Sequence, residues 1–328
     1  MEVLIIGGAG MIGRKLAARL GGDGRLGDRE IDRLVLVDLV TPAAPTSTLR
    51  VEVGESDLSL PGAANALVAD RPDVIFHLAA VLSGEAEADF EKGYRVNVDG
   101  TRALLEAIRA VGDGYRPRLV FSSTIAVFGA PFPDVIGDDF ALTPLTSYGT
   151  AKAIAELLLA DYSRRGFVDG IGIRLPTICV RPGAPNGAAS GFFSSIIREP
   201  LVGLEAVLPV PDDVLHWHAS PRAAVAFLVR AATIDSALLG ERRSLTMPGV
   251  AATVAEQIES LRRAAGDGAV RLIRREPDET IARIVAGWPR RFEPRRALAL
   301  GFRAEDDFDT IIRAHVEDEL GGRIGGRG

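Results

Sequence analysis

Two side chains that can move a proton stand four residues apart in the segment SYGTAKAIAE, residues 147–156. Tyr148 and Lys152 share one face of the predicted helix, because residues four apart along a helix are neighbours. A tyrosine with an ordinary pKa of about 10 is a poor base, but a nearby ammonium group stabilises the phenolate and lowers that pKa. The spacing therefore predicts Tyr148 as a general base assisted by Lys152, against the alternative of a surface tyrosine and a solvated lysine.

Hydroxyl groups come just before this helix, in the segment FSSTIAVFG. Thr124 is the candidate for holding the reacting oxygen in line with Tyr148, and Ser123 is the alternative. Ser122 is expected to line the cofactor, and Lys152 to donate a hydrogen bond to a ribose of that cofactor.

Three glycines separate a predicted strand from a predicted helix in IIGGAGMIGRKLAARL. They are Gly7, Gly10 and Gly13, with Met11 and Ile12 at the start of the helix. Glycine lacks the Cβ that would keep a pyrophosphate from the backbone, and a helix N-terminus offers free N–H donors. The turn therefore predicts an anion site, and a glycine-rich tight turn without a ligand is the alternative.

Asp38 ends the second predicted strand. Its carboxylate there can accept hydrogen bonds from both hydroxyls of an adenosine ribose, and it would repel a 2′-phosphate. A solvated aspartate at a strand end is the alternative, but its occurrence together with the glycines favours a dinucleotide, and NAD over NADP.

Further residues are expected along the same cofactor. Asp57 and Leu58 follow the third strand, where a carboxylate and an apolar side chain could bound an adenine. Leu78, Ala79 and Ala80 end the fourth strand in HLAAV and would leave room for a cofactor to cross the sheet edge.

Short β-branched segments alternate with longer helical patterns in the first half, which predicts βαβ units and a parallel sheet. Several strands are apolar at consecutive positions, so helices should cover both faces of the sheet. The fold class is therefore α/β, a Rossmann-type doubly wound parallel sheet with a smaller C-terminal substrate lobe. The expected strands span residues 2–7, 32–38, 48–54, 73–79, 118–123 and 170–175, and the expected helices 11–21, 60–70, 88–111 and 146–166.

The pattern becomes rich in proline, glycine and asparagine after residue 175. We expect an NAD-binding domain over residues 1–175, with 212–240 packing back on it. The substrate lobe should then consist of residues 176–211 and 241–328.

Composition narrows the class of protein. The net charge of −6 and the dispersed basic residues argue against a nucleic-acid partner. Cys179 has no second cysteine to pair with, and it is interpreted as a small buried residue. No apolar segment reaches the length of a membrane span. Only four histidines occur, and His216 and His218 lack the carboxylate or cysteine neighbours that a metal site needs. The sequence therefore predicts a cytoplasmic protein that binds no metal.

Together, these motifs resemble the extended short-chain dehydrogenases/reductases of the NAD-dependent epimerase/dehydratase group. The resemblance rests on the glycine turn, Asp38, HLAA, NVDGT, SST and the Y-x-x-x-K pair, and it covers about the first 180 residues. It implies that Thr124 is the catalytic hydroxyl, that Asn97 helps to form the active site, and that Pro176 begins the loop along the nicotinamide. It also implies a homodimer in which helices 88–111 and 146–166 pair.

The second half departs from the nucleotide-sugar enzymes of that group. It resembles instead a branch that oxidises a four-carbon sugar acid to its 2-keto acid with NAD. Arg222 is the candidate clamp for the acid's carboxylate, with a surface arginine as the alternative, and Ser190, Gly191 and His218 are candidates for the polyol. An epimerase or dehydratase that retains NAD, and a dinucleotide sensor without catalysis, are the rival functions.

Overall fold

The computed structural model describes residues 1–183 and 189–325. A seven-stranded sheet lies at the centre of the first part of the molecule, in the order β13-β9-β7-β6-β1-β4-β5, and every neighbouring pair is parallel. Its strands are β1 (Glu2–Ile6), β4 (Arg33–Asp38), β5 (Arg50–Glu55), β6 (Val74–His77), β7 (Arg118–Thr124), β9 (Asp169–Leu175) and β13 (Ser244–Thr246).

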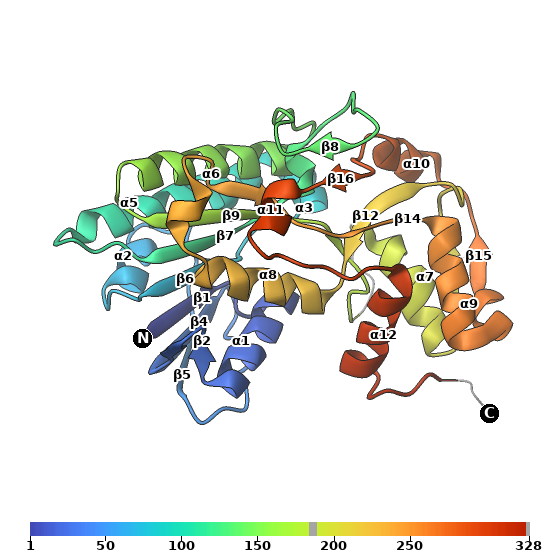
Figure 1. The fold of residues 1–328 in the computed structure, drawn as a ribbon, viewed down its shortest axis with the longest axis horizontal. Coiled ribbons are helices and arrows are strands. Elements are labelled where there is room, and N and C mark those ends of the chain that lie inside the picture. The colour runs from blue at the N-terminus through green and yellow to red at the C-terminus, as the bar shows by residue number, and fades with distance from the viewer. Residues whose placement is uncertain (184–188, 326–328) are drawn as a thin grey trace.

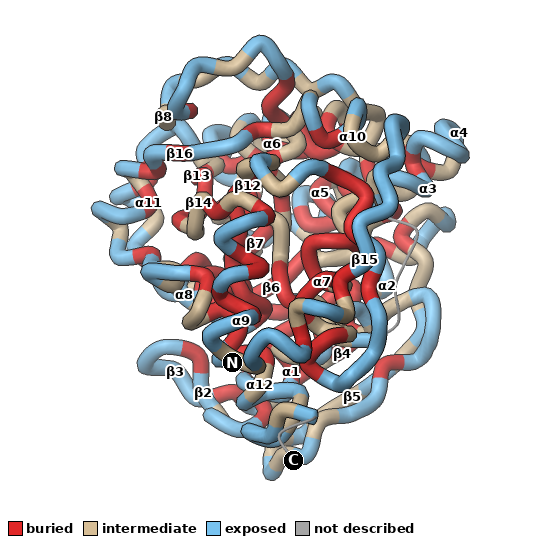
Figure 2. The backbone as a smooth tube through the Cα atoms, turned by 90° about the vertical axis from the view of Figure 1, so that its right-hand side faces the viewer, coloured by how far each residue is buried: buried red, intermediate tan, exposed pale blue. Residues whose placement is uncertain are grey.

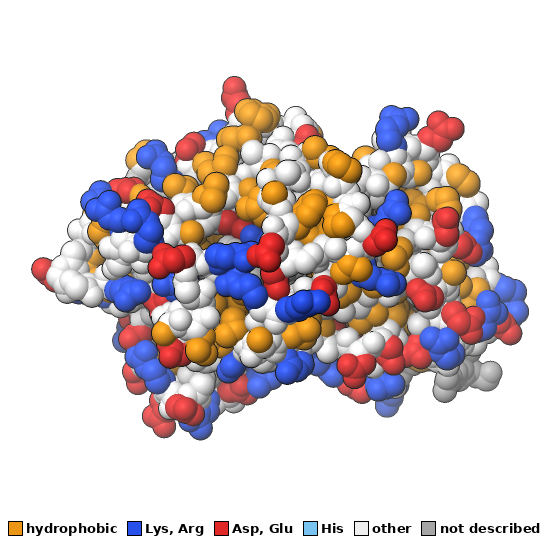
Figure 3. Space-filling model, turned by 45° about the horizontal axis from the view of Figure 1, so that its top comes forward, with side chains coloured by type: hydrophobic (Ala, Val, Ile, Leu, Met, Phe, Trp, Pro, Cys, Tyr) orange, Lys and Arg blue, Asp and Glu red, His pale blue; other side chains and the backbone are white. Residues whose placement is uncertain are grey.

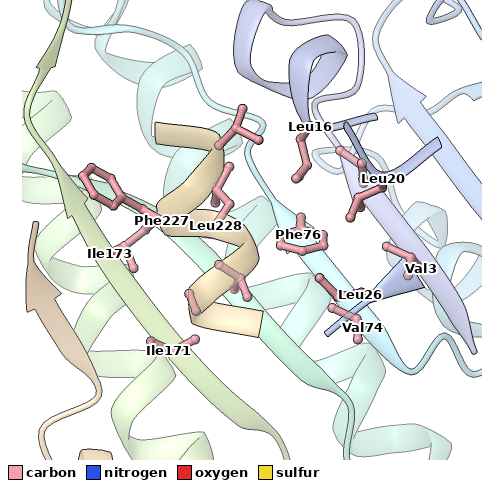
Figure 4. Close-up of a cluster of buried hydrophobic side chains, with 14 of the residues drawn as sticks. Val3, Leu16, Leu20, Leu26, Val74, Phe76, Ile171, Ile173, Phe227 and Leu228 are labelled. Carbon is pink, nitrogen blue, oxygen red and sulfur yellow. The ribbon is translucent and has the colours of Figure 1, made fainter. Parts of the chain in front are cut away.

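Helices cover both faces of this sheet (Figure 1). On one face lie α1 (Met11–Asp23) and α8 (Pro221–Thr233), which pack against each other over a core of Leu, Ile, Val and Phe (Figure 4). On the other lie α2 (Ala63–Val68), α5 (Thr101–Val111) and α6 (Ser147–Arg164). The strands are apolar on consecutive residues because both faces are buried. The predicted fold class is confirmed.

A second cluster of buried side chains forms away from the sheet. It lies among α7 (Gly191–Leu201), α9 (Val254–Val270) and α12 (Phe308–Glu319). The helices that carry it lie on the right in Figure 1, and Figure 2 colours much of α7 as buried. The smaller sheets around this cluster contain β10 (Thr177–Ile178), β12 (Leu215–Ala219), β14 (Val250–Thr253), β11 (Ala206–Leu208) and β15 (Ile273–Arg275), and α10 (Glu279–Ala286) lies beside them.

A bridging cluster ties this second part to the helix of the Tyr/Lys pair. Trp217 of β12 packs in one buried cluster with Ala153 of α6 and Ile125, the residue that follows β7. The same cluster takes in β8 (Ile136–Gly137) and β16 (Phe292–Glu293), which pair in parallel. The sheet of β10 and β12 is therefore held close to the start of α6.

Two elements differ from the sequence expectation. The segment 88–111 is interrupted: α3 (Ser83–Ala88), α4 (Phe90–Tyr94) and a π-helical turn, η1 (Arg95–Gly100), precede α5. Asp89 begins α4 by accepting a hydrogen bond from the Lys92 N–H, which separates it from α3. The seventh strand, β13, was not expected, because three residues carry too little periodicity to predict a strand.

Candidate active site and cofactor site

The glycine turn between β1 and α1 has the close backbone contacts that a dinucleotide site requires. Gly7 has a φ of +95°, and a Cβ on it would lie 2.6 Å from the Ala79 nitrogen. A Cβ on Gly13 would lie 2.1 Å from the Gly7 carbonyl oxygen. Neither position admits a side chain, and Gly10 leaves the N-terminus of α1 without a side-chain cap. Free N–H groups at the start of α1, which includes Met11 and Ile12, can therefore bind a pyrophosphate.

Asp38 lies beside this turn at the end of β4. One carboxylate oxygen accepts a hydrogen bond from the Ala9 N–H at 2.9 Å, and the other accepts one from the Leu39 N–H at 2.7 Å. These bonds fix the carboxylate at the carboxyl end of the sheet, next to the anion site. The arrangement suits a ribose with free hydroxyls.

Residues 78–80 are partly exposed at the end of β6 and touch the glycine turn, as the contact of Gly7 with Ala79 shows. Asn97 fixes the residue that follows them. Its side-chain oxygen accepts a hydrogen bond from the Val81 N–H at 2.8 Å, and its amide donates to the Val81 carbonyl at 2.9 Å. Asn97 is buried and both ends of its amide are bonded to Val81, so its side chain positions the loop that follows β6.

The two residues expected at the adenine, Asp57 and Leu58, differ in their exposure to solvent. Asp57 is partly exposed and accepts a hydrogen bond from the Ser59 N–H at 2.8 Å. Leu58 is buried in the core on the α5 side of the sheet, beside Gly100. The expectation that the Leu58 side chain faces an adenine is therefore corrected, because its side chain completes the core.

Strand β7 decides between the two candidate hydroxyls. Successive side chains of a strand point to opposite faces. The hydroxyl of buried Ser123 donates to Glu156 inside the protein, whereas Ser122 and Thr124 point the other way and are partly exposed. The Thr124 hydroxyl accepts a hydrogen bond from the Ala126 N–H at 3.1 Å. This geometry favours Thr124 over Ser123 for contact with a substrate.

Helix α6 begins close to the end of β7. The Thr146 hydroxyl caps the helix by accepting from the Gly149 N–H at 3.0 Å. A Cβ on Gly149 would lie 2.2 Å from the Ala126 carbonyl oxygen, so only glycine allows this approach. Tyr148, one residue earlier, is thereby held beside the segment that follows Thr124.

Lys152 is buried one turn further along α6. Its ammonium donates to the Ser122 carbonyl at 2.7 Å and lies 5.8 Å from the centre of the Tyr148 ring. Burial lowers the pKa of Lys152 to about 7, against the opposing effect of Glu156, and burial raises the pKa of Tyr148 to about 12. Burial therefore acts against the lowering of the tyrosine pKa that the sequence predicts, because removal of water disfavours the charged forms of both the phenol and the ammonium group.

A buried ion pair lies behind the Tyr/Lys pair. Glu156, one turn after Lys152, accepts two charge-assisted hydrogen bonds from Arg174 of β9, of 3.0 Å from Nε and 2.7 Å from Nη2, besides the bond from Ser123. The network joins α6, β7 and β9. Sequence reasoning missed it, although Glu156 continues the i, i+4 spacing of Tyr148 and Lys152.

The substrate candidates of the second part are not all brought to one place. Pro176 links β9 to β10 and is buried. Ser190 and Gly191 lie at the start of α7 and are partly exposed, and Ser190 accepts hydrogen bonds from Arg181. Arg181 was not among the sequence candidates, because nothing in its neighbours marks it before the chain folds.

Two of these assignments are corrected. His218 is fully buried between Phe193 and Phe308, and its ring is hydrogen-bonded to Gln257 at 3.1 Å, so it cannot contact a substrate hydroxyl in this structure. Arg222 lies on the surface, half exposed. It already pairs with Asp318 at 2.5 Å and Glu317 at 2.9 Å on α12, so it is not free to clamp a carboxylate.

Within residues 1–183 and 189–325, no group of three or more His, Cys, Asp or Glu side chains is arranged to hold a metal ion. No helix in the same ranges combines the length and the apolar character that crossing a membrane requires.

Residues 3–218 match the NAD dependent epimerase/dehydratase family. The chain belongs to this family. The resemblance inferred from the sequence motifs is thus confirmed, and NAD is the cofactor. The residues present suit this cofactor, since the glycine turn excludes side chains where a pyrophosphate must approach and Asp38 stands beside it.

Similar members of this family extend over nearly the whole chain. D-erythronate dehydrogenase from Cupriavidus necator is 49% identical over 97% of this chain and 98% of its own length. D-erythronate dehydrogenase from Haemophilus influenzae is 42% identical over 98% of this chain and 100% of its own length. A crystal structure described as a nucleoside-diphosphate-sugar epimerase from Agrobacterium tumefaciens is 62% identical, with a TM-score of 0.97 over 98% of this chain and 95% of that one.

Proposed function

We propose that this protein is an NAD-dependent dehydrogenase that oxidises D-erythronate at its 2-hydroxyl group. The observation that carries the proposal is the pair of D-erythronate dehydrogenases that match it over almost their entire lengths. The Tyr148, Lys152 and Thr124 side chains, at the start of α6 and the carboxyl end of β7, supply groups suited to the oxidation of a CH–OH group.

In the proposed mechanism each of these side chains has one role. Bound NAD supplies a positively charged ring that accepts the hydride from the substrate carbon. Tyr148 takes the proton of the substrate hydroxyl, and Thr124 holds the same oxygen in line by a hydrogen bond. Lys152 holds the ribose next to the reacting ring. Burial raises the pKa of Tyr148, and we infer that positive charge brought to the site by the bound cofactor would favour the phenolate.

Purified protein with NAD and a panel of four- to six-carbon aldonic acids tests this function through the absorbance of NADH. We expect turnover with D-erythronate in preference to its epimer threonate, with one NADH formed per acid oxidised. No NADH from any acid would contradict the proposal.

The name given to the Agrobacterium tumefaciens structure favours a second candidate, an epimerase that returns the hydride to its sugar. Such an enzyme would convert a nucleotide sugar without net NADH release. The same assay with UDP-sugars separates the two functions. A protein that binds NAD but converts neither class of substrate would instead be a sensor.

We further propose a cytoplasmic homodimer built on α6 and the helices that precede it. Leu157 of α6 is 66% exposed, although it belongs to the apolar segment LLLADY. Figure 3 shows hydrophobic side chains gathered on the face where Figure 1 carries α6 and the loop around β8. Light scattering at micromolar concentration should give twice the chain mass of 34.8 kDa. A mass of one chain would contradict the dimer.

The division into an NAD-binding domain over 1–175 and a substrate lobe over 176–211 and 241–328 is part of this proposal, except that β13 (Ser244–Thr246) pairs with β9 and therefore belongs to the sheet of the NAD-binding domain. On this division the active site forms where the carboxyl ends of β6 and β7 face the lobe.

A further inference from the structure

Arg181 is a cation without an anionic partner in the part of the chain that would hold the substrate. It is partly buried, and burial lowers its pKa. No carboxylate within residues 1–183 and 189–325 forms an ion pair with it. Two other sheltered arginines have such partners: Arg174 pairs with Glu156, and Arg198 pairs with Glu199 at 2.5 Å. A sheltered charge without a partner is costly, which indicates that an anion completes the site.

The backbone of Arg181 is fixed from both sides by α7. Its N–H donates to the hydroxyl of buried Ser194 at 3.0 Å, and its carbonyl accepts from Arg198 at 2.7 Å. The side chain is held at one nitrogen only. Nη2 donates to the carbonyl of Ser190 at 2.9 Å and to its hydroxyl at 2.8 Å. Among the described residues, the N–H groups of Nε and Nη1 have no hydrogen-bond acceptor.

The start of α7 adds further donors next to this guanidinium. Among the described residues, no side chain caps the helix at Ser190, so the N–H groups of its first turn lack a side-chain partner there. A guanidinium and a helix N-terminus that meet at one residue both favour a negative charge there.

The position of Arg181 in the fold relates it to the reacting groups. Leu175, the last residue of β9, is the register partner of Thr124, and Arg181 follows six residues later, after β10. β10 pairs with β12, whose Trp217 packs against the start of α6. The site is thus on the side of the molecule where β7 ends at Thr124 and where α6, which carries Tyr148 in its first turn, begins.

We propose that Arg181, with Ser190 and the first turn of α7, binds the carboxylate of the sugar-acid substrate. The inference rests on the proposed function and gives Arg181 the role that Arg222 cannot fill. The planar guanidinium is the side chain that binds a carboxylate through two parallel hydrogen bonds.

The test is steady-state kinetics of Arg181→Met with D-erythronate and NAD. We expect KM for the acid to rise by about 10- to 100-fold, because a charge-assisted hydrogen bond is lost, while KM for NAD stays unchanged. Arg181→Lys keeps the positive charge but lacks the planar guanidinium. Its KM for D-erythronate should lie between those of the wild type and Arg181→Met. Arg222→Met is the matched control and should keep the wild-type KM for D-erythronate.

Two measurements separate the possible failures. Thermal unfolding with and without NAD shows whether Arg181→Met folds and binds its cofactor, and guanidinium added to Arg181→Ala should restore part of the lost acid affinity. Wild-type turnover of D-erythronate with an unchanged KM in a folded Arg181→Met variant would overturn this inference and leave the proposed function standing. Absence of wild-type turnover would overturn the function itself.

Discussion

Replacement of Tyr148 by phenylalanine is expected to lower kcat for D-erythronate oxidation by about 10²- to 10⁴-fold, the usual contribution of a general base. The ring would remain in place at the start of α6, because Phe fills the same volume and the helix cap at Thr146 is untouched. Only the proton acceptor is lost. NAD affinity, measured by the shift in thermal unfolding, should therefore remain near the wild-type value.

The dependence of kcat on pH provides a second test of the Tyr148→Phe variant. Since burial raises the pKa of Tyr148, the fraction of phenolate grows as pH rises, and wild-type kcat for oxidation should rise with pH through the neutral range. The residual activity of Tyr148→Phe should lose this rise.

Tyr162 offers a matched control on the same helix. Its hydroxyl is bonded to Glu106 of α5, and its pKa, also about 12, is raised by burial and by that carboxylate. Tyr162→Phe should keep both kcat and its pH dependence. Equal activity of Tyr148→Phe and wild type would refute the role of the tyrosine as base.

Replacement of Glu156 by glutamine is expected to lower the free energy of unfolding by about 3–5 kcal/mol. The carboxylate is buried and accepts hydrogen bonds from Arg174 and Ser123. A glutamine would turn an amide N–H₂ toward guanidinium donors, so Arg174 would be left as an uncompensated buried charge. Urea unfolding monitored by circular dichroism measures the loss.

Asp161 provides the comparison for this variant, since it lies on the same helix and pairs with Arg164 at 2.6 Å while both are more than half exposed. Asp161→Asn should change the unfolding free energy by less than about 1 kcal/mol, because solvent screens such pairs. A double variant, Glu156→Leu with Arg174→Met, should recover most of the stability lost in Glu156→Gln. If Glu156→Gln proved as stable as Asp161→Asn, the buried network would contribute little to the fold.

Sequence reasoning succeeded where local pattern determines structure. The strand before Gly7, Asp38 at the end of β4 and the helix of Tyr148 were predictable, because turns and periodicity depend on neighbouring residues. The Tyr148–Lys152 spacing likewise depends only on the helical repeat, which places both residues on one face of α6, where Lys152 donates to the Ser122 carbonyl.

The failures share a physical cause, which is that partners distant in sequence decide what a polar group does. Arg222 was expected to bind the substrate carboxylate, but in the fold it pairs with two carboxylates of α12. His218 was expected to contact substrate hydroxyls, but Phe193 and Phe308 enclose its ring. The pKa of Tyr148 depends on how much surrounding protein removes water from it. None of these partners can be identified from the residues beside the group in question.

The elements that complete the sheet come late in the sequence, and this affects how the chain folds during synthesis. The core beneath α1 is closed by α8, and β13 covers the edge strand β9, so the sheet takes residues from more than two hundred positions after β1. A nascent chain that has emerged only as far as β9 would expose an apolar face and an unpaired edge. Completion of the Rossmann sheet must therefore wait until the ribosome has passed Thr246.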